Sequence, residues 1–166
     1  MNIAYEAQAW QGFYIMTGGA AAALAGLLFV AMSLHAKTIT NHPFYMNRAI
    51  GTLTSLTSML LIAASVLVPG QPTLWIGVEV EAAAILFLVM TLRGLRRLGS
   101  GWLSKSRARA VAESIAGSAW HVLFIAAGIS LVIRAGGGFY VLALVIAFMF
   151  AWNIYIAWML ITEVSE

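Results

Sequence analysis

Five long apolar stretches, separated by short polar connections, dominate the pattern of this chain. Each has about 19 to 24 residues, which at about 1.5 Å per residue of α-helix is enough to cross roughly 30 Å of hydrocarbon. The stretches are continuously apolar rather than alternating, which favours helices over the strands of a barrel. We therefore predict an all-α, multi-pass membrane helix bundle with five transmembrane spans at 11–34, 50–68, 74–92, 115–133 and 139–161.

Composition supports lipid as the solvent for much of the chain. Of the 166 residues, 62% are hydrophobic and 9% are charged, whereas soluble domains carry about 25% charged residues. A chain of this size cannot hide so much apolar surface in a core of its own. Because no long polar segment is left over for a soluble domain, we expect residues 1–166 to form a single transmembrane domain.

Positive charge is distributed unevenly among the connections. The first connection carries Lys37 and Arg48, and the fourth carries only Arg134. The third, 93–114, carries six basic residues, which are Arg93, Arg96, Arg97, Lys105, Arg107 and Arg109. Alternate threading puts the first and third connections on one side, which collects two plus six, or eight, of the nine Lys and Arg residues. Because cytoplasmic loops are enriched in Lys and Arg, we predict an outside N-terminus and an inside C-terminus in a prokaryotic cytoplasmic membrane.

The third connection is also interpreted as a surface that meets lipid. Residues 103–110 resemble a helical lead-in to the fourth span, and the six basic side chains would lie on anionic headgroups of the cytoplasmic leaflet. The alternative is that these charges serve only as topological anchors. The second connection, Pro69-Gly70-Gln71-Pro72, is typical of a tight turn and predicts an antiparallel hairpin of spans two and three.

Glu79 and Glu81 place two carboxylates inside the third predicted span. One alternative is therefore that this span does not cross the bilayer, which leaves four crossings. A separation of two residues turns the side chains about 200° apart on a helix, so they cannot both face one neighbour. Because carboxylates in a membrane face protein or water, we interpret the pair as an outer cation-binding or proton-binding site. The competing interpretation is an ion pair with Arg134 near the same end.

A second group of polar side chains lies toward the predicted inner side. Thr54 and Ser58 are in the second span, His121 is in the fourth and Asn153 is in the fifth. We expect these residues to continue a polar ion or proton route inward from the acidic pair. The alternative is structural, because hydroxyl groups bond back to helix carbonyls and His–Asn contacts join helices.

Small residues share one face of the first span, at Gly18, Ala22 and Gly26. They would let another helix backbone approach closely, either within the bundle or in an oligomer. We favour packing within the bundle for this face. We still expect a homo-oligomer or a subunit of a larger membrane complex, because five short helices leave little room for an internal pathway.

Several functions lack the residues that they need. The absence of cysteine excludes disulfides and thiolate chemistry, and no phosphate-binding loop, HExxH or GxSxG motif occurs. We therefore predict no enzyme activity, no cofactor and no metal site. The net charge of +3 is explained by membrane topology, so no nucleic-acid partner is expected.

These observations lead to one main functional hypothesis with two alternatives. The first is a small oligomeric channel or ion-transport protein whose outer acidic pair attracts or binds a cation or proton. The second is a non-catalytic accessory or assembly subunit of a larger membrane complex. The third and most distant is a haem-binding redox subunit, because the three histidines do not lie at matched depth.

Overall fold

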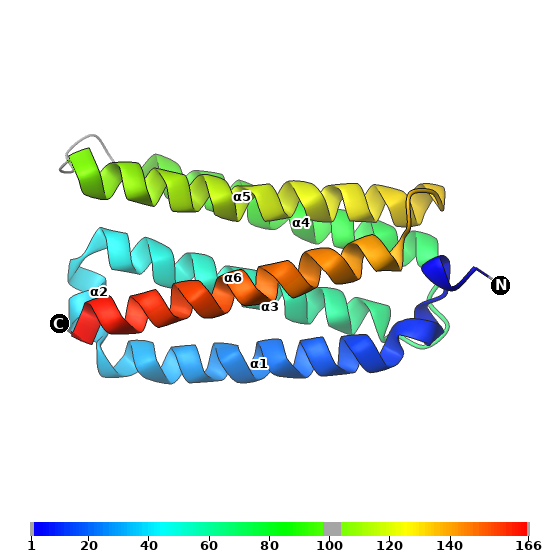
Figure 1. The fold of residues 1–166 in the computed structure, drawn as a ribbon, viewed down its shortest axis with the longest axis horizontal. Helices are drawn as coiled ribbons and strands as arrows, with labels where there is room; N and C mark the ends of the chain where they lie inside the picture. Colours follow the sequence, from blue (N-terminus) through cyan, green and yellow to red (C-terminus); the bar gives the residue numbers. More distant parts are fainter. Residues whose placement is uncertain (1, 98–103, 166) are drawn as a thin grey trace.

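The computed structural model describes residues 2–97 and 104–165, which form an antiparallel helical bundle without a strand (Figure 1). Two short 3-10 segments, η1 (Ile3–Tyr5) and η2 (Ala7–Trp10), lead into the bundle. The α-helices that follow are α1 (Gln11–Leu34), α2 (Ala36–Asn41), α3 (Pro43–Val66), α4 (Thr73–Arg97), α5 (Ser104–Ile133) and α6 (Phe139–Ser165). The all-α fold class is therefore confirmed.

The predicted spans fall on α1, α3, α4, α5 and α6, with differences at the boundaries. Span 11–34 coincides with α1, whereas α3 begins at Pro43, seven residues before the predicted start at residue 50. Proline is well suited to the first position of a helix, because its fixed φ is helical and its missing N–H is not needed there. The helical lead-in to the fourth span is confirmed, since α5 begins at Ser104.

Four helical stretches in the described part of the chain are long and apolar enough to cross a membrane. They are Ala7–Leu34, Pro43–Val66, Thr73–Arg93 and Phe139–Glu163. The stretch that contains Glu79 and Glu81 is among them, so these residues do not disqualify the third span. The shorter apolar stretch is Ala119–Ile133 in α5, which extends only about 22 Å at 1.5 Å per residue. These lengths are compatible with a multi-pass membrane protein, while the fifth crossing stays a prediction.

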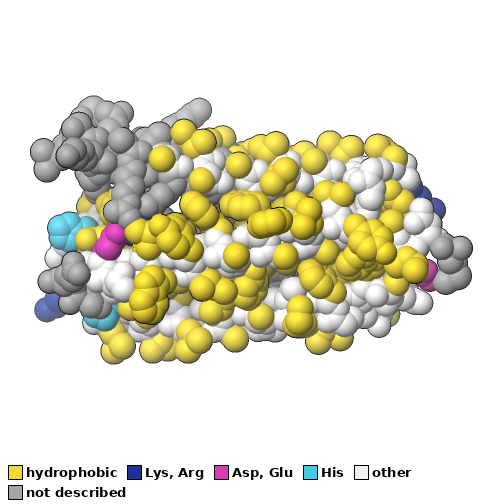
Figure 2. Space-filling model, in the orientation of Figure 1, with side chains coloured by type: hydrophobic (Ala, Val, Ile, Leu, Met, Phe, Trp, Pro, Cys, Tyr) yellow, Lys and Arg dark blue, Asp and Glu magenta, His cyan; other side chains and the backbone are white. Residues whose placement is uncertain are grey.

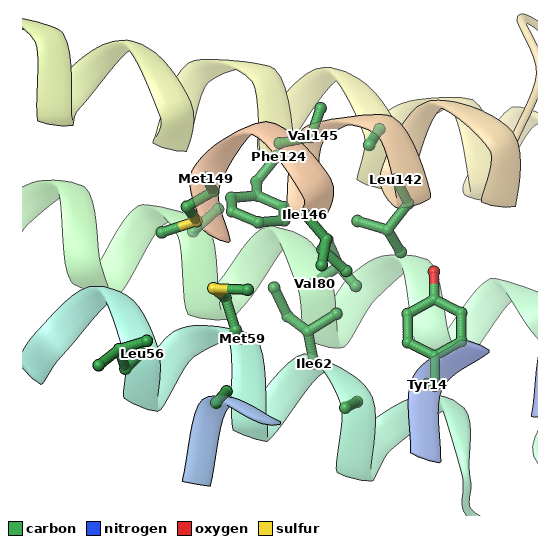
Figure 3. Packing of buried hydrophobic residues seen from close by; sticks show 14 of the residues in the cluster. Tyr14, Leu56, Met59, Ile62, Val80, Phe124, Leu142, Val145, Ile146 and Met149 are labelled. Atoms are coloured by element: carbon green, nitrogen blue, oxygen red, sulfur yellow. The ribbon is translucent and has the colours of Figure 1, made fainter. Parts of the chain in front are cut away.

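The helices are arranged around α3. Figure 1 shows α4 and α5 side by side along one flank, α3 and α6 in the middle and α1 along the opposite flank. The two chain termini lie at opposite ends of the bundle. The buried core draws side chains from all five long helices, including Tyr14 of α1, Ile62 of α3, Val80 of α4, Phe124 of α5 and Ile146 of α6 (Figure 3).

The outer surface is largely apolar. In Figure 2 hydrophobic side chains cover the length of the visible face, while charged and histidine side chains gather at its two ends. Leu27, Phe148 and Trp158 are among the most exposed, with 68%, 58% and 66% of their surface accessible. A soluble monomer does not normally expose so much contiguous apolar surface, which supports a lipid environment for the sides of the bundle.

Close helix contacts are made through small residues. A Cβ added to Gly18 of α1 would stand 2.8 Å from Ala63 Cβ of α3, so Gly18 packs within the bundle as the favoured interpretation held. Ala22 and Gly26 instead lie on the exposed side of α1. A second close contact joins Gly77 of α4 to Gly128 of α5, where a Cβ at Gly77 would meet the backbone oxygen of Gly128 at 3.0 Å. In a membrane such contacts replace the hydrophobic effect as the main source of helix association.

The N-terminal segment ties the connections together at one end of the bundle. The Thr73 hydroxyl donates to Tyr5 O at 2.7 Å, and Gly137 N donates to the Tyr5 hydroxyl at 3.0 Å. The predicted tight turn between α3 and α4 contains Gly70 with φ +71°, and the turn between α5 and α6 contains Gly138 with φ +51°. A side chain at Gly138 would also collide with Ala4 and Tyr5, so glycine is needed there for two reasons.

Gly77→Ala should lower the free energy of unfolding by about 1–3 kcal/mol. The added methyl group would overlap α5 at Gly128 O and at Leu131 Cβ, so the two helices would have to separate. Gly19→Ala is the matched control, because nothing lies within 4 Å of a Cβ at that position. Equilibrium denaturation in mixed micelles measures both variants, and equal losses would contradict the close α4–α5 packing.

Candidate functional site

The two carboxylates of α4 face different surroundings. Glu79 is exposed, and its Oε2 accepts a short hydrogen bond from the Ser65 hydroxyl of α3. Glu81 is half-buried on the side of α5, where its Cγ would be 2.6 Å from a Cβ at Gly128. The divergence expected from their two-residue spacing is therefore present. Glu79 alone presents its carboxylate to the outside of the bundle.

Arg134 takes part in no ion pair with the residues that the structure describes. It is an exposed residue of the turn between α5 and α6, with φ +52°. The alternative of an Arg134 ion pair with Glu79 or Glu81 is thus not realised in this conformation. Among the described residues, neither Glu79 nor Glu81 forms a salt bridge that would account for its presence in this span.

Asn153 joins two helices and Ser58 bonds within its own helix, so neither residue lines an open path. Asn153 Nδ2 on α6 donates to Ser55 Oγ on α3 at 2.7 Å and to Met149 O at 2.8 Å. The Ser58 hydroxyl donates to Ser55 O at 2.7 Å. Both Asn153 and Ser58 are 2% exposed, so the polar groups of both residues are buried in the bundle. The structural interpretation accounts for these two residues.

The two other residues of the inner group, His121 and Thr54, differ in how far they are buried. His121 is a buried residue of α5, with 4% of its surface exposed. Thr54 is partly exposed on α3, and its hydroxyl has no hydrogen-bond partner among the described residues. Of the four inner residues, Thr54 is the one that a molecule outside the bundle could reach.

An apolar layer separates the inner polar group from Glu79 within the bundle. Along α3, Met59 and Ile62 lie between Ser58 and Ser65, and Figure 3 shows them facing Phe124, Ile146 and Met149. All of these apolar residues are at most 2% exposed. Among the described residues, the interior of one chain therefore shows no polar connection from Glu79 to Ser58 and Asn153.

Sequence reasoning missed a salt bridge between α3 and α6. Arg48 Nη1 of α3 lies 2.7 Å from Glu163 Oε2 of α6, with 2% and 26% of these side chains exposed. The guanidinium group also stands 4.6 Å from the centre of the Phe44 ring, and the Tyr45 hydroxyl approaches Glu163 O at 3.5 Å. The hydropathy pattern puts Arg48 in the first connection and Glu163 after the last predicted span, which ends at residue 161. Recognising Pro43 as a helix start would have put Arg48 inside a helix.

The predicted lipid-contacting surface can be described only at Arg93, which is exposed near the end of α4. The side chains of Arg96, Arg97, Lys105, Arg107 and Arg109 lie outside the described part of the structure, although their backbones belong to α4 and α5. Contact with anionic headgroups therefore stays a prediction.

Neither a search for metal sites nor comparison with known proteins indicates a function. Within the described ranges, no three His, Asp or Glu side chains are grouped so that they could hold a metal ion. The chain matches no protein-family model, no curated protein and no solved structure. The exposed Glu79 with its Ser65 donor is the arrangement with the most distinctive chemistry, because a carboxylate on such a surface can bind a cation or a proton.

Glu163→Gln should lower the free energy of unfolding by about 1–3 kcal/mol. The amide keeps the shape of the carboxyl group but removes the charge that compensates the buried Arg48 guanidinium. Glu6→Gln is the control, because Glu6 forms no ion pair with the described residues. The same denaturation measurement applies, and an unchanged stability for Glu163→Gln would show that this pair does not hold α6 against α3.

Proposed function

We propose that this chain is a small oligomeric channel or ion-transport protein of a membrane, with Glu79 as the group that binds a cation or a proton. The observation that carries the proposal is the exposed Glu79 carboxylate, held by Ser65 on a helix apolar enough to cross a bilayer. Glu79 lies six residues after Thr73, which is roughly 9 Å along the helix. A charged group at such a depth costs free energy and marks a functional site by default.

The Ser65 hydroxyl supports ion binding at Glu79 because it contacts only one of the two carboxylate oxygens. It donates to Glu79 Oε2, whereas Oε1 has no hydrogen-bond partner among the described residues. One carboxylate oxygen is thereby fixed while the other is open to a cation or a proton. A hydroxyl is a suitable neighbour, because it can donate to the ionised carboxylate and accept from the protonated one.

The route proposed for the ion runs along the outside of the bundle, between neighbouring copies. The interior of one chain is filled by apolar side chains such as Met59 and Phe124, whereas Ser65 and Thr54 are both partly exposed on α3. Ions would therefore pass Glu79 and continue beside α3. In this proposal Asn153 stabilises α3 against α6, Ser58 bonds within α3 and His121 is part of the buried side of α5.

The proposed orientation follows from charge and topology. With five crossings the chain ends lie on opposite sides, in agreement with their places at opposite ends of the bundle (Figure 1). The end with Lys37 and Arg93 is assigned to the cytoplasm of a prokaryotic cell, and the end with Arg134 to the outside. Glu79, which follows the turn at the Arg134 end, then lies in the outer half of the membrane.

A second function is favoured by the closed interior. The described residues form an apolar core between Ser58 and Ser65 and apolar outer sides, and such a bundle also suits a non-catalytic accessory or assembly subunit. Copurification with a larger membrane protein at fixed stoichiometry would favour this alternative. A homogeneous homo-oligomer would favour the first proposal.

Glu79→Gln should reduce ion flux by at least about tenfold, because the amide cannot carry the negative charge that binds the cation. The measurement is H⁺, Na⁺ and K⁺ flux into proteoliposomes of the purified chain. Glu81→Gln is the control on the same helix, since Glu81 packs against α5 and should leave most of the flux intact.

Two results would contradict the proposed function. One is a wild-type protein that carries none of the three ions. The other is a flux that Glu79→Gln leaves unchanged.

A further inference from the structure

The surface around the Glu79 carboxyl group is apolar on both helices that form it. On α4, the residues four before, three after and seven after Glu79 lie on its side of the helix, and these are the exposed Trp75, Ala82 and Leu86. Ser65 of α3 is flanked in the same way by the exposed Leu61 and Val68. The four large side chains among these neighbours have between 50% and 57% of their surface accessible. The carboxyl group therefore stands on a face that contacts lipid chains when the helices are in a bilayer.

The depth of Glu79 puts it below the lipid headgroups. Tryptophan side chains favour the headgroup level of a bilayer, and Trp75 is in the first turn of α4. Glu79 follows Trp75 by four residues, which is about 6 Å further along the helix. At this level the exposed side of the helix meets hydrocarbon, which can neither solvate a charge nor accept or donate a hydrogen bond.

No charged side chain compensates the Glu79 carboxylate within the described ranges. Glu79 forms no ion pair there, and Glu81 on the same helix is turned toward α5. The described titratable groups on the elements beside α4 make no hydrogen bond or ion pair with Glu79. They are Tyr45 and Arg48 at the far end of α3, His121 in α5, Arg134 in the turn after α5, and Tyr5 and Glu6 before α1.

A proton and a metal cation make different demands on such a site. A proton neutralises the carboxyl group by forming one O–H bond and needs no further ligand. A metal cation must exchange its hydration shell for several oxygen ligands. The described side chains of this face offer the carboxylate and the Ser65 hydroxyl, and their exposed neighbours are apolar. The site therefore suits a proton better than a metal cation.

We propose that the ion bound by Glu79 is a proton rather than Na⁺, K⁺ or Mg²⁺, and that the carboxyl group faces lipid in its neutral form. The proton belongs on Oε1, because the Ser65 hydroxyl already donates to Oε2. The neutral group keeps that hydrogen bond through its carbonyl oxygen. This inference rests on the proposed function, which it narrows from ion transport to proton transport.

A carbodiimide that dissolves in membranes tests the protonation of Glu79. Dicyclohexylcarbodiimide reacts with a protonated carboxyl group and stays attached to it as an acylurea, which mass spectrometry of the digested protein locates. The wild-type chain in lipid vesicles should be modified at Glu79. The rate should fall by about tenfold per pH unit once most of the group is ionised, as for the loss of one proton. At fixed pH, chloride salts of Na⁺, K⁺, Mg²⁺ and choline at equal ionic strength should give equal rates.

Two variants and a second reagent control the experiment. Glu79→Gln should abolish the modification of α4, whereas Glu81→Gln leaves Glu79 in place and should keep it. Glu6 precedes the apolar stretch Ala7–Leu34 and provides a carboxyl group outside it. A positively charged, water-soluble carbodiimide should therefore react with Glu6 faster than with Glu79.

Three results would overturn the inference. The first is slower modification of Glu79 in Na⁺, K⁺ or Mg²⁺ than in choline at the same pH, which would mean that a metal cation occupies the carboxylate. The second is an equal rate for Glu79 and Glu6 with the water-soluble reagent, which would put Glu79 in water. The third is a Glu79 that the membrane-soluble reagent does not modify at any pH.

The proton assignment and the proposed function fail on different results. Modification of Glu79 as expected, in a chain that carries no ion, would support the proton site and contradict the transport function. Na⁺ or K⁺ flux that depends on Glu79 would support the transport function and contradict the proton assignment. H⁺ flux that is lost after modification of Glu79 would support both.

Discussion

Hydrocarbon cannot form hydrogen bonds, and the rest of this structure follows from that constraint. Backbone N–H and C=O groups in lipid must be satisfied within their own segment, which leaves helices as the available element for continuously apolar stretches. Several side chains follow the same rule, since the Thr17, Ser33 and Thr162 hydroxyls all bond to a carbonyl of the preceding turn. With polar groups satisfied locally, helices associate through close packing, as at Gly18–Ala63 and Gly77–Gly128.

Three polar contacts between helices are arranged along α3. At one end Arg48 pairs with Glu163, and in the inner half Ser55 accepts from Asn153. At the other end Ser65 donates to Glu79. The apolar residues between these contacts, such as Met59 and Ile62, seal the interior. The same helix therefore stabilises the fold through its contacts with α6, and its Ser65 holds the Glu79 carboxylate to which we assign ion binding.

The sequence predicted the helical class and the five apolar segments, because hydropathy over about twenty residues reports how much apolar surface a segment has. The sequence does not locate the start of α3. Polar residues such as Arg48 indicate a connection by their hydropathy, whereas the helix begins at Pro43. Nor could it pair Arg48 with Glu163, because these residues are 115 positions apart and only packing brings them together.

Only part of the candidate site could be predicted, because the sequence pattern reports positions on one helix and not contacts between helices. Spacing on one helix was enough to infer that Glu79 and Glu81 diverge. It could not show that Ser65 is the partner of Glu79, nor that Asn153 joins α6 to α3 through Ser55. Those outcomes depend on which helices are neighbours, and a single sequence does not contain that information in its periodicity.

The account depends most on α5 crossing the membrane, so that an odd number of spans separates the chain ends. Single cysteines placed near each end and treated with a membrane-impermeant thiol reagent test this directly. We predict that intact cells label the N-terminal cysteine, whereas the C-terminal cysteine reacts only after the membrane is permeabilised. Labelling of both ends from the same side would contradict the five-span arrangement, and with it the outer position assigned to Glu79.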